Sequence, residues 1–117
     1  MQQENKILVE KQGAVTMLHI QGDMTAFSEP FLSKAYEDAN EQGASKIVLK
    51  FDENAYINSG GIAVLIQLLA QSKRNNQQIG ITGLSDHFTK IFHMVGITKF
   101  ANIYASVEQA MADLFAS

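Results

Sequence analysis

The chain of 117 residues has no cysteine, no tryptophan and a single proline. Without cysteine, disulfide bonds, thiolate catalysis and cysteine-based zinc sites are excluded. Charged residues make up only 18% of the chain, the net charge is −3, and Lys and Arg form no cluster, so binding to nucleic acid is not favoured. Apolar residues reach 46%. The composition therefore predicts a packed core, and the length fits one domain, residues 1–117.

Long hydrophobic segments are missing as well. Residues 1–6 are polar and are not followed by the apolar region of a signal peptide. The longest apolar-rich run, Gly60 to Ala70, is shorter than the roughly 20 residues that a membrane-spanning helix needs. We therefore expect a cytoplasmic protein without direct membrane insertion.

Sequence motifs of nucleotide and metal sites are also missing. The chain contains neither G-x-x-x-x-G-K-[ST] nor G-x-G-x-x-G, and His87 and His93 lack the spacing of a helical metal site. Asp52 closes a predicted strand, as the acceptor aspartate of a receiver domain does. The acidic pair and the lysine that hold Mg²⁺ and phosphate in such a domain are not in place. We expect no cofactor and no metal, and we interpret Asp52 as the start of an exposed loop.

Hydrophobic periodicity predicts strands that alternate with helices. Strands are expected at Ile7–Glu10, Ala14–Gln21, Lys46–Phe51, Gln78–Thr82 and, in short form, within Lys99–Tyr104. Helices are expected from Ser28 to Gly43, after Ser59, from Ser85 to Gly96 and from Ser106 onward. The order β-β-α-β-α-β-α-(β)-α predicts an α/β fold with a mixed, mostly parallel sheet of four to five strands and about four helices.

The second of these helices carries more apolar residues than one stripe can hold. Its core stripe is formed by Ile62, Leu65, Ile66 and Leu69. Val64 and Leu68 lie about 200–240° from Ile62 at 100° per residue. They must therefore meet another helix or a partner, and we predict that they form an exposed apolar contact patch.

The junction before this helix, Tyr56 to Ile62, reads Y-I-N-S-G-G-I. A serine at a helix start lies beside unpaired backbone N–H groups, so Ser59 is either a plain N-cap or a phosphate acceptor. A helix start can stabilise an added anion by roughly 0.3–2 kcal/mol. A catalytic serine is disfavoured because the run is not G-x-S-x-G and no histidine (His19, His87 or His93) is placed as its base.

The run from Tyr56 to Ile66 resembles the signature of STAS domains, the group of bacterial anti-sigma-factor antagonists (anti-anti-sigma factors). In that signature a polar residue precedes a serine, a small residue and Gly-Leu, and the matching positions are Asn58, Ser59, Gly60 and Gly61-Ile62. A second family motif, G-x-[LI]-D with a following proline, matches Gly22-Asp23-Met24-Thr25 and Pro30. Further similarity at residues 91–97 and 105–110 extends the resemblance over nearly the whole chain.

The resemblance implies a phosphorylation switch without catalysis of its own. Such a protein binds and sequesters an anti-sigma factor that is also a serine kinase, in a partner-switching pathway. The kinase phosphorylates the serine, which ends binding, and a serine phosphatase restores it. The implied site comprises Ser59 as the phosphorylated residue and Asp23, Thr25, Asn58, Gly60, Gly61, Val64 and Leu68 as loop and partner-binding residues.

Two departures from the family pattern remove negative charge near the serine. Asn58 stands where an acidic residue is often found, and Thr25 stands where the earlier motif has Asp. Thr25 is therefore a second candidate acceptor. The alternative function within the same family is a cytoplasmic subunit of an ABC-type lipid transporter, which binds the ATPase and needs no reversible phosphate.

Overall fold

The computed structural model describes residues 5–116. Its strands are β1 (Lys6–Gln12), β2 (Val15–Gln21), β3 (Lys46–Phe51), β4 (Gln78–Thr82) and β5 (Asn102–Ile103). Its helices are α1 (Glu29–Glu41), α2 (Ser59–Arg74), α3 (Asp86–Met94) and α4 (Val107–Ala116), with short 3-10 turns η1 (Ala26–Ser28) and η2 (Ile97–Lys99). The predicted α/β fold class and element order are confirmed for this part of the chain.

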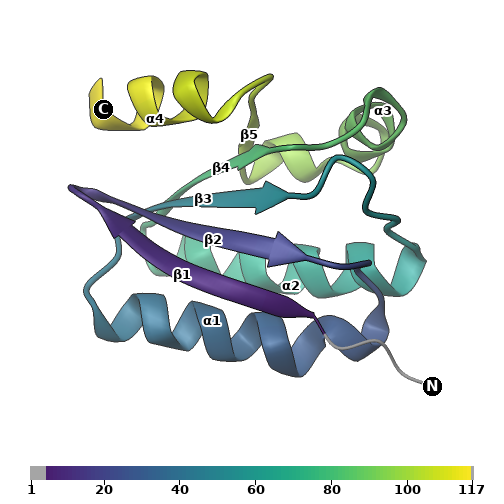
Figure 1. Cartoon of the computed structure of the whole chain (residues 1–117), viewed down its shortest axis with the longest axis horizontal. Helices are drawn as coiled ribbons and strands as arrows, with labels where there is room; N and C mark the ends of the chain where they lie inside the picture. Colours follow the sequence, from purple (N-terminus) through teal and green to yellow (C-terminus); the bar gives the residue numbers. More distant parts are fainter. Residues whose placement is uncertain (1–4, 117) are drawn as a thin grey trace.

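All five strands form one sheet in the order β1-β2-β3-β4-β5. Strands β1 and β2 are antiparallel and form a hairpin whose turn contains Gly13 at φ +61°. The pairs β2–β3, β3–β4 and β4–β5 are parallel. Helices α1 and α2 cover one face of the sheet and α4 covers the other (Figure 1). The sheet is therefore mixed and mostly parallel, as the sequence predicts.

Two cores lie on the two faces of the sheet, and β2 contributes to both. Leu18 and Ile20 are buried in the larger core, under α1 and α2, whereas Val15 and Met17 are buried in the smaller core under α4. This division follows from the alternation of side chains along a strand. Strand β3 is also buried on both faces, which explains its continuous apolar run.

Helix α2 corrects one prediction. Val64 and Leu68 are only 9% and 6% exposed and belong to the larger core together with residues of α1, so they form no exposed contact patch. A cavity of 110 Å³ between α1 and α2 is lined in part by the same two side chains. The physical reason is that α2 packs against both the sheet and α1. Side chains on two sides of the helix are therefore buried, and not only those that face the sheet.

The remaining helix ends follow local sequence rules. Helix α1 begins at Glu29 with Pro30 in its first turn, one residue after the predicted start, and Gly43 follows its end at φ +78°. Ser106 precedes α4, and its Oγ accepts a hydrogen bond from the Gln109 N–H at 3.1 Å. Among the helices of residues 5–116, none combines the length and apolarity that crossing a bilayer would take.

Candidate functional site

The start of α2 is held by a second segment of the chain, residues 23–28, which follows β2. The Met24 N–H donates to the Tyr56 carbonyl at 2.9 Å, and the Asn58 N–H donates to the Met24 carbonyl at 3.1 Å. The Tyr56 N–H also donates to Asp23 Oδ1 at 3.0 Å. Two segments that are far apart in the sequence are thereby joined into one surface, and Asp23 lies beside the junction that carries Ser59.

Two glycines allow this close approach. A Cβ on Gly61 would lie 2.1 Å from the Met24 carbonyl oxygen, and a Cβ on Gly60 would lie 2.9 Å from the Ala26 nitrogen. Neither glycine has a positive φ. Glycine is therefore required at both positions by space and not by backbone conformation.

The cap of α2 is Asn58, and Ser59 is the first residue inside the helix. Asn58 has an extended backbone (φ −93°, ψ −179°), and its Oδ1 accepts from the Gly61 N–H at 2.9 Å. The interpretation of Ser59 as a plain N-cap is therefore wrong by one residue. Asn and Ser are about equally good caps, so local preference does not choose between neighbours. The pairing of residue 58 with Met24 makes the choice.

Ser59 is exposed at the beginning of a helix of 16 residues. Within residues 5–116, its hydroxyl has no hydrogen-bond partner, and the N–H groups of Ser59 and Gly60 have no acceptor. Unpaired N–H groups and the helix dipole make a helix start favourable for negative charge. The first turn carries no acidic side chain, whereas the last turn carries Lys73 and Arg74. The hydroxyl is thus accessible and lies at a site suited to an anion.

Thr25 lies in the same surface, but its hydroxyl has a structural partner. Thr25 Oγ1 accepts from the Phe27 N–H at 3.1 Å, and the Thr25 N–H donates to Ser28 Oγ at 2.9 Å. This reciprocal pair caps η1. Thr25 therefore shapes the segment that packs on Gly60 and is less available than Ser59.

Comparison with known proteins identifies the family of this fold. The family model of the STAS domain matches residues 6–110. The chain belongs to the STAS domain family. The anti-sigma-B factor antagonist of Staphylococcus aureus (strain NCTC 8325 / PS 47) is 20% identical over 87 residues, which are 74% of this chain and 81% of the relative.

Solved structures show the same fold as this STAS domain. An anti-sigma factor antagonist from Mycobacterium paratuberculosis superposes with a TM-score of 0.78 at 17% identity, over 95% of this chain and 94% of the other. The Bacillus cell fate determinant SpoIIAA in the phosphorylated form gives a TM-score of 0.65 at 13% identity, over 92% and 98% of the two chains. At these identities the likeness concerns the fold alone.

The STAS domain has two exposed aromatic side chains beside Ser59 that the sequence reasoning did not assign. Phe27 is 58% exposed and follows the Ala26 that packs on Gly60, and Tyr56 is 59% exposed. The Tyr56 ring contacts Phe88 edge to face, with centroids 5.9 Å apart. The sequence does show an aromatic residue in each of the two family motif regions. It does not show that these side chains are exposed, because exposure depends on how the two segments pack.

Other predicted features lie outside this surface. His19 Nε2 contacts Glu10 Oε1 at 2.8 Å within the hairpin, so that histidine is engaged elsewhere. Asp52 is exposed, and its carbonyl accepts from the Ala55 N–H at 2.9 Å in a turn. In the described part of the STAS domain, no three His, Asp or Glu side chains are grouped so that they could hold a metal ion.

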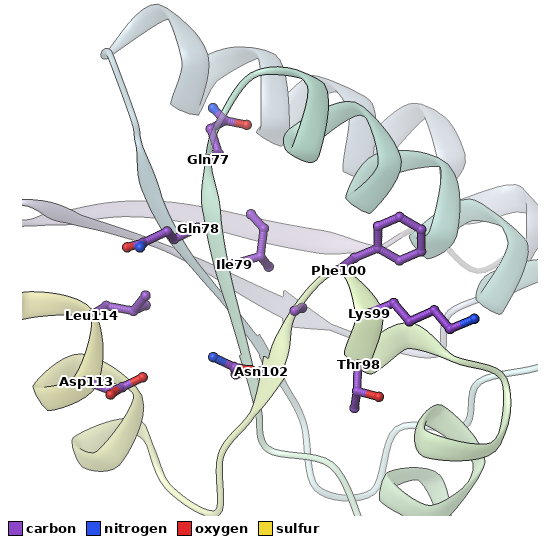
Figure 2. A pocket seen from close by; sticks show the side chains of 10 residues that line it. Gln77, Gln78, Ile79, Thr98, Lys99, Phe100, Asn102, Asp113 and Leu114 are labelled. Carbon is purple, nitrogen blue, oxygen red and sulfur yellow. The ribbon is translucent and has the colours of Figure 1, made fainter. Parts of the chain in front are cut away.

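A pocket of 260 Å³ between β4, η2, β5 and α4 contains none of the predicted site residues (Figure 2). Two of its polar side chains, Gln77 and Asp113, have partners within the protein. The Gln77 amide bonds to Tyr36 at 2.5 Å and to Asn40 at 2.6 Å, and the Asp113 carboxylate accepts from the Tyr104 hydroxyl. Burial, and then this bond to Asp113, raises the pKa of Tyr104. These contacts tie helices to the sheet.

Proposed function

We propose that this STAS domain is a cytoplasmic anti-sigma-factor antagonist that is switched by phosphorylation of Ser59. In the unphosphorylated state it binds and sequesters an anti-sigma factor with serine kinase activity. The observation that carries the proposal is the exposed, unbonded hydroxyl of Ser59 at the first position of α2. The proposed role requires no catalysis by this chain.

The fold can accept a phosphate at Ser59 at low cost. A phosphoserine carries about −1.5 to −2 charges at neutral pH. The open N–H groups of Ser59 and Gly60 and the dipole of α2 offset this charge, by roughly 0.3–2 kcal/mol. The exposed position leaves room for the phosphate without moving the core. Phosphorylation is therefore expected to change the surface more than the stability.

The same phosphate charge is expected to weaken the binding of a partner that contacts this surface. A like charge placed in an interface costs several kcal/mol, and each 1.4 kcal/mol is a factor of ten in affinity. Asp23 already places a carboxylate in the junction, where its Oδ1 accepts from Tyr56. A dianion at Ser59 adds to it, so a partner with acidic groups at this surface is released.

The contact surface is proposed to include the exposed Phe27 and Tyr56, from the two segments that meet at the start of α2, in place of the buried Val64 and Leu68. Exposed aromatic side chains are the residues that most often dominate binding energy. Replacing both by alanine is expected to weaken partner binding while the fold is retained, because more than half of each side chain is exposed.

The experiment combines phosphate mapping with partner capture. The protein is isolated from its native cells, phosphorylation is mapped by mass spectrometry, and partners are captured with wild type, Ser59→Ala and Ser59→Asp. Ser59→Asp is expected to lose a kinase partner that wild type and Ser59→Ala retain. Ser45→Asp is the matched control, because Ser45 is an exposed serine that lies before β3.

Two outcomes contradict the proposal. One is an unmodified Ser59 together with identical partners for all variants. The other is a Ser45→Asp variant that loses the partner as fully as Ser59→Asp. Capture of a transporter ATPase by an unphosphorylated chain would instead support the role of a transporter subunit.

A further inference from the structure

Strand β1 leaves one long side of the sheet open. It is the first strand of the order β1-β2-β3-β4-β5, and among residues 5–116 only β2 pairs with it (Figure 1). Its seven residues pair one to one with those of β2, from Lys6 opposite Gln21 to Gln12 opposite Val15, without a bulge. The strand also contains no proline. Bulges, prolines and short length are among the usual means of blocking an edge strand, and β1 has none of them. It does carry charged side chains, another such means, at Lys6, Glu10 and Lys11, so a strand that pairs with it must match these charges.

An apolar side chain stands at the middle of this edge. Leu8 is 61% exposed on the sheet face that carries α4. Ile7 and Val9 point to the opposite face and pack against the larger core. A charged residue lies on each side of Leu8 on the same face, Lys6 before it and Glu10 after it. Two charges of opposite sign thus lie at equal distances from Leu8, with apolar residues between them.

We propose that β1 pairs with β1 of a second copy of this chain, antiparallel and centred on Leu8. A two-fold axis perpendicular to the sheet then lies between the two Leu8 residues. Lys6 lies opposite Glu10 of the second copy, and Ile7 lies opposite Val9. Opposite residues in an antiparallel pair have Cβ atoms about 4.5–5.5 Å apart, close enough for both contacts. The two sheets become one continuous sheet.

Charge complementarity selects this register. Opposite residues must lie on the same face, so two-fold pairing centres on a residue. Centring on Glu10 places Glu10 opposite itself, and centring on Val9 places Glu10 opposite Leu8. Centring on Ile7 places Lys6 opposite Leu8. Only the register centred on Leu8 places each lysine opposite a glutamate and the exposed leucine opposite another leucine.

Glu10 is held ready for this contact. Its Oε1 contacts His19 Nε2 at 2.8 Å, which fixes the carboxylate over the strand. The bond to His19 lowers the pKa of Glu10, so the group stays ionised at neutral pH. A carboxylate has acceptor sites on both oxygens. The two oxygens together offer about four such sites. Lys6 of the second copy therefore binds a carboxylate that also has His19 and the Gln12 side chain as partners.

A groove beside the same edge is a second feature that favours docking of a protein here. It has a volume of 430 Å³ and is lined by β1 and α1, including Ile7, Pro30, Phe31 and Ala35. In the proposed pair the second copy's β1 lies along this edge, and its α1 lies next to the groove. Apolar surface is then removed from water on both faces of the sheet: Leu8 on the face that carries α4, and this groove on the face that carries α1.

The test is a charge exchange between two variants. Lys6→Glu places glutamate opposite Glu10 in the homodimer, and Glu10→Lys places lysine opposite Lys6, so each variant alone is expected to lose about tenfold or more in dimer affinity. In an equimolar mixture, each variant faces its opposite charge at both contacts. The mixture is therefore expected to dimerise as well as wild type. Sedimentation equilibrium measures all three samples.

Lys11→Glu is the matched control. It makes the same charge change on the same strand, but Lys11 lies opposite the uncharged Asn5 in the proposed register, so the dissociation constant is expected to stay unchanged. A wild-type protein that remains monomeric at its highest soluble concentration overturns the proposal. So does a dimer that survives both single variants, or a mixture that fails to recover dimer.

Discussion

Replacing Gly61 with alanine is expected to destabilise the protein, although alanine is the better helix former. The added Cβ would lie 2.1 Å from the Met24 carbonyl oxygen and 2.5 Å from its carbon, whereas real Cβ contacts stay beyond 3.0 Å. Met24 must therefore move away by about 0.9 Å from 2.1 Å to 3.0 Å. The Met24 oxygen and carbon both belong to the backbone, so rotation of a side chain cannot relieve the clash.

The magnitude follows from what Met24 holds. Its N–H and carbonyl bond to Tyr56 and Asn58 at 2.9 and 3.1 Å, and a shift of this size strains both bonds. Overpacking of this kind costs about 1–3 kcal/mol, and the helix propensity of alanine returns up to about 1 kcal/mol. The free energy of unfolding should fall by up to about 2 kcal/mol. For a chain of this size, each kcal/mol lowers Tm by about 4 °C.

Urea denaturation and calorimetry of Gly61→Ala measure this loss. The matched control is Ala63→Gly, an exposed position two residues later in α2, which reports the intrinsic glycine-to-alanine preference at this end of the helix. The steric reasoning is refuted if Gly61→Ala gains as much stability as Ala63→Gly loses. Such a result would mean that Met24 does not press on the helix start.

Three further predictions concern the cap, the helix interface and the partly buried phenol of Tyr104. Asn58→Ala should lower the free energy of unfolding by about 1 kcal/mol in urea, whereas Asn58→Asp should retain it, because both Asn and Asp cap well. Leu68→Ala should cost about 2–5 kcal/mol because Leu68 is buried; a near-neutral result would mean that it is exposed. Tyr104 should titrate above 10.0 by ultraviolet absorbance, and Asp113→Ala should lower its pKa. Since the folded pKa is raised, this stabilisation is present below pH 10.0 and is lost as the pH rises through the folded pKa.

The sequence predicted the element order because alternation and helical spacing are local properties. Ser106 and Gly43 likewise marked helix ends through their own side chain or backbone preference. The cap at Asn58 was missed because two adjacent residues were equally good candidates, and a contact with Met24, more than thirty residues earlier, decides between them.

The surroundings of Ser59 were predicted in part, whereas its role as the phosphorylated residue stays a prediction. The Ser59 position and its neighbour Asp23 follow from motif residues, and the structure brings them together through Tyr56. The contact patch was misplaced because a helical wheel gives the angle of Leu68 but not which neighbour covers that angle. The exposed Phe27 was missed because exposure of an aromatic side chain is a property of the assembled surface.

The hydrogen bond between Asn58 and Gly61 has a consequence for inheritance and engineering. The Asn58 side chain caps the helix, and the hydroxyl of the next residue, Ser59, is the proposed phosphate acceptor. Either residue can therefore be substituted while the other is kept. Substitutions of Ser59 should yield folded proteins locked in one signalling state. A lineage could also exchange its acceptor residue, or lose it, without losing the scaffold.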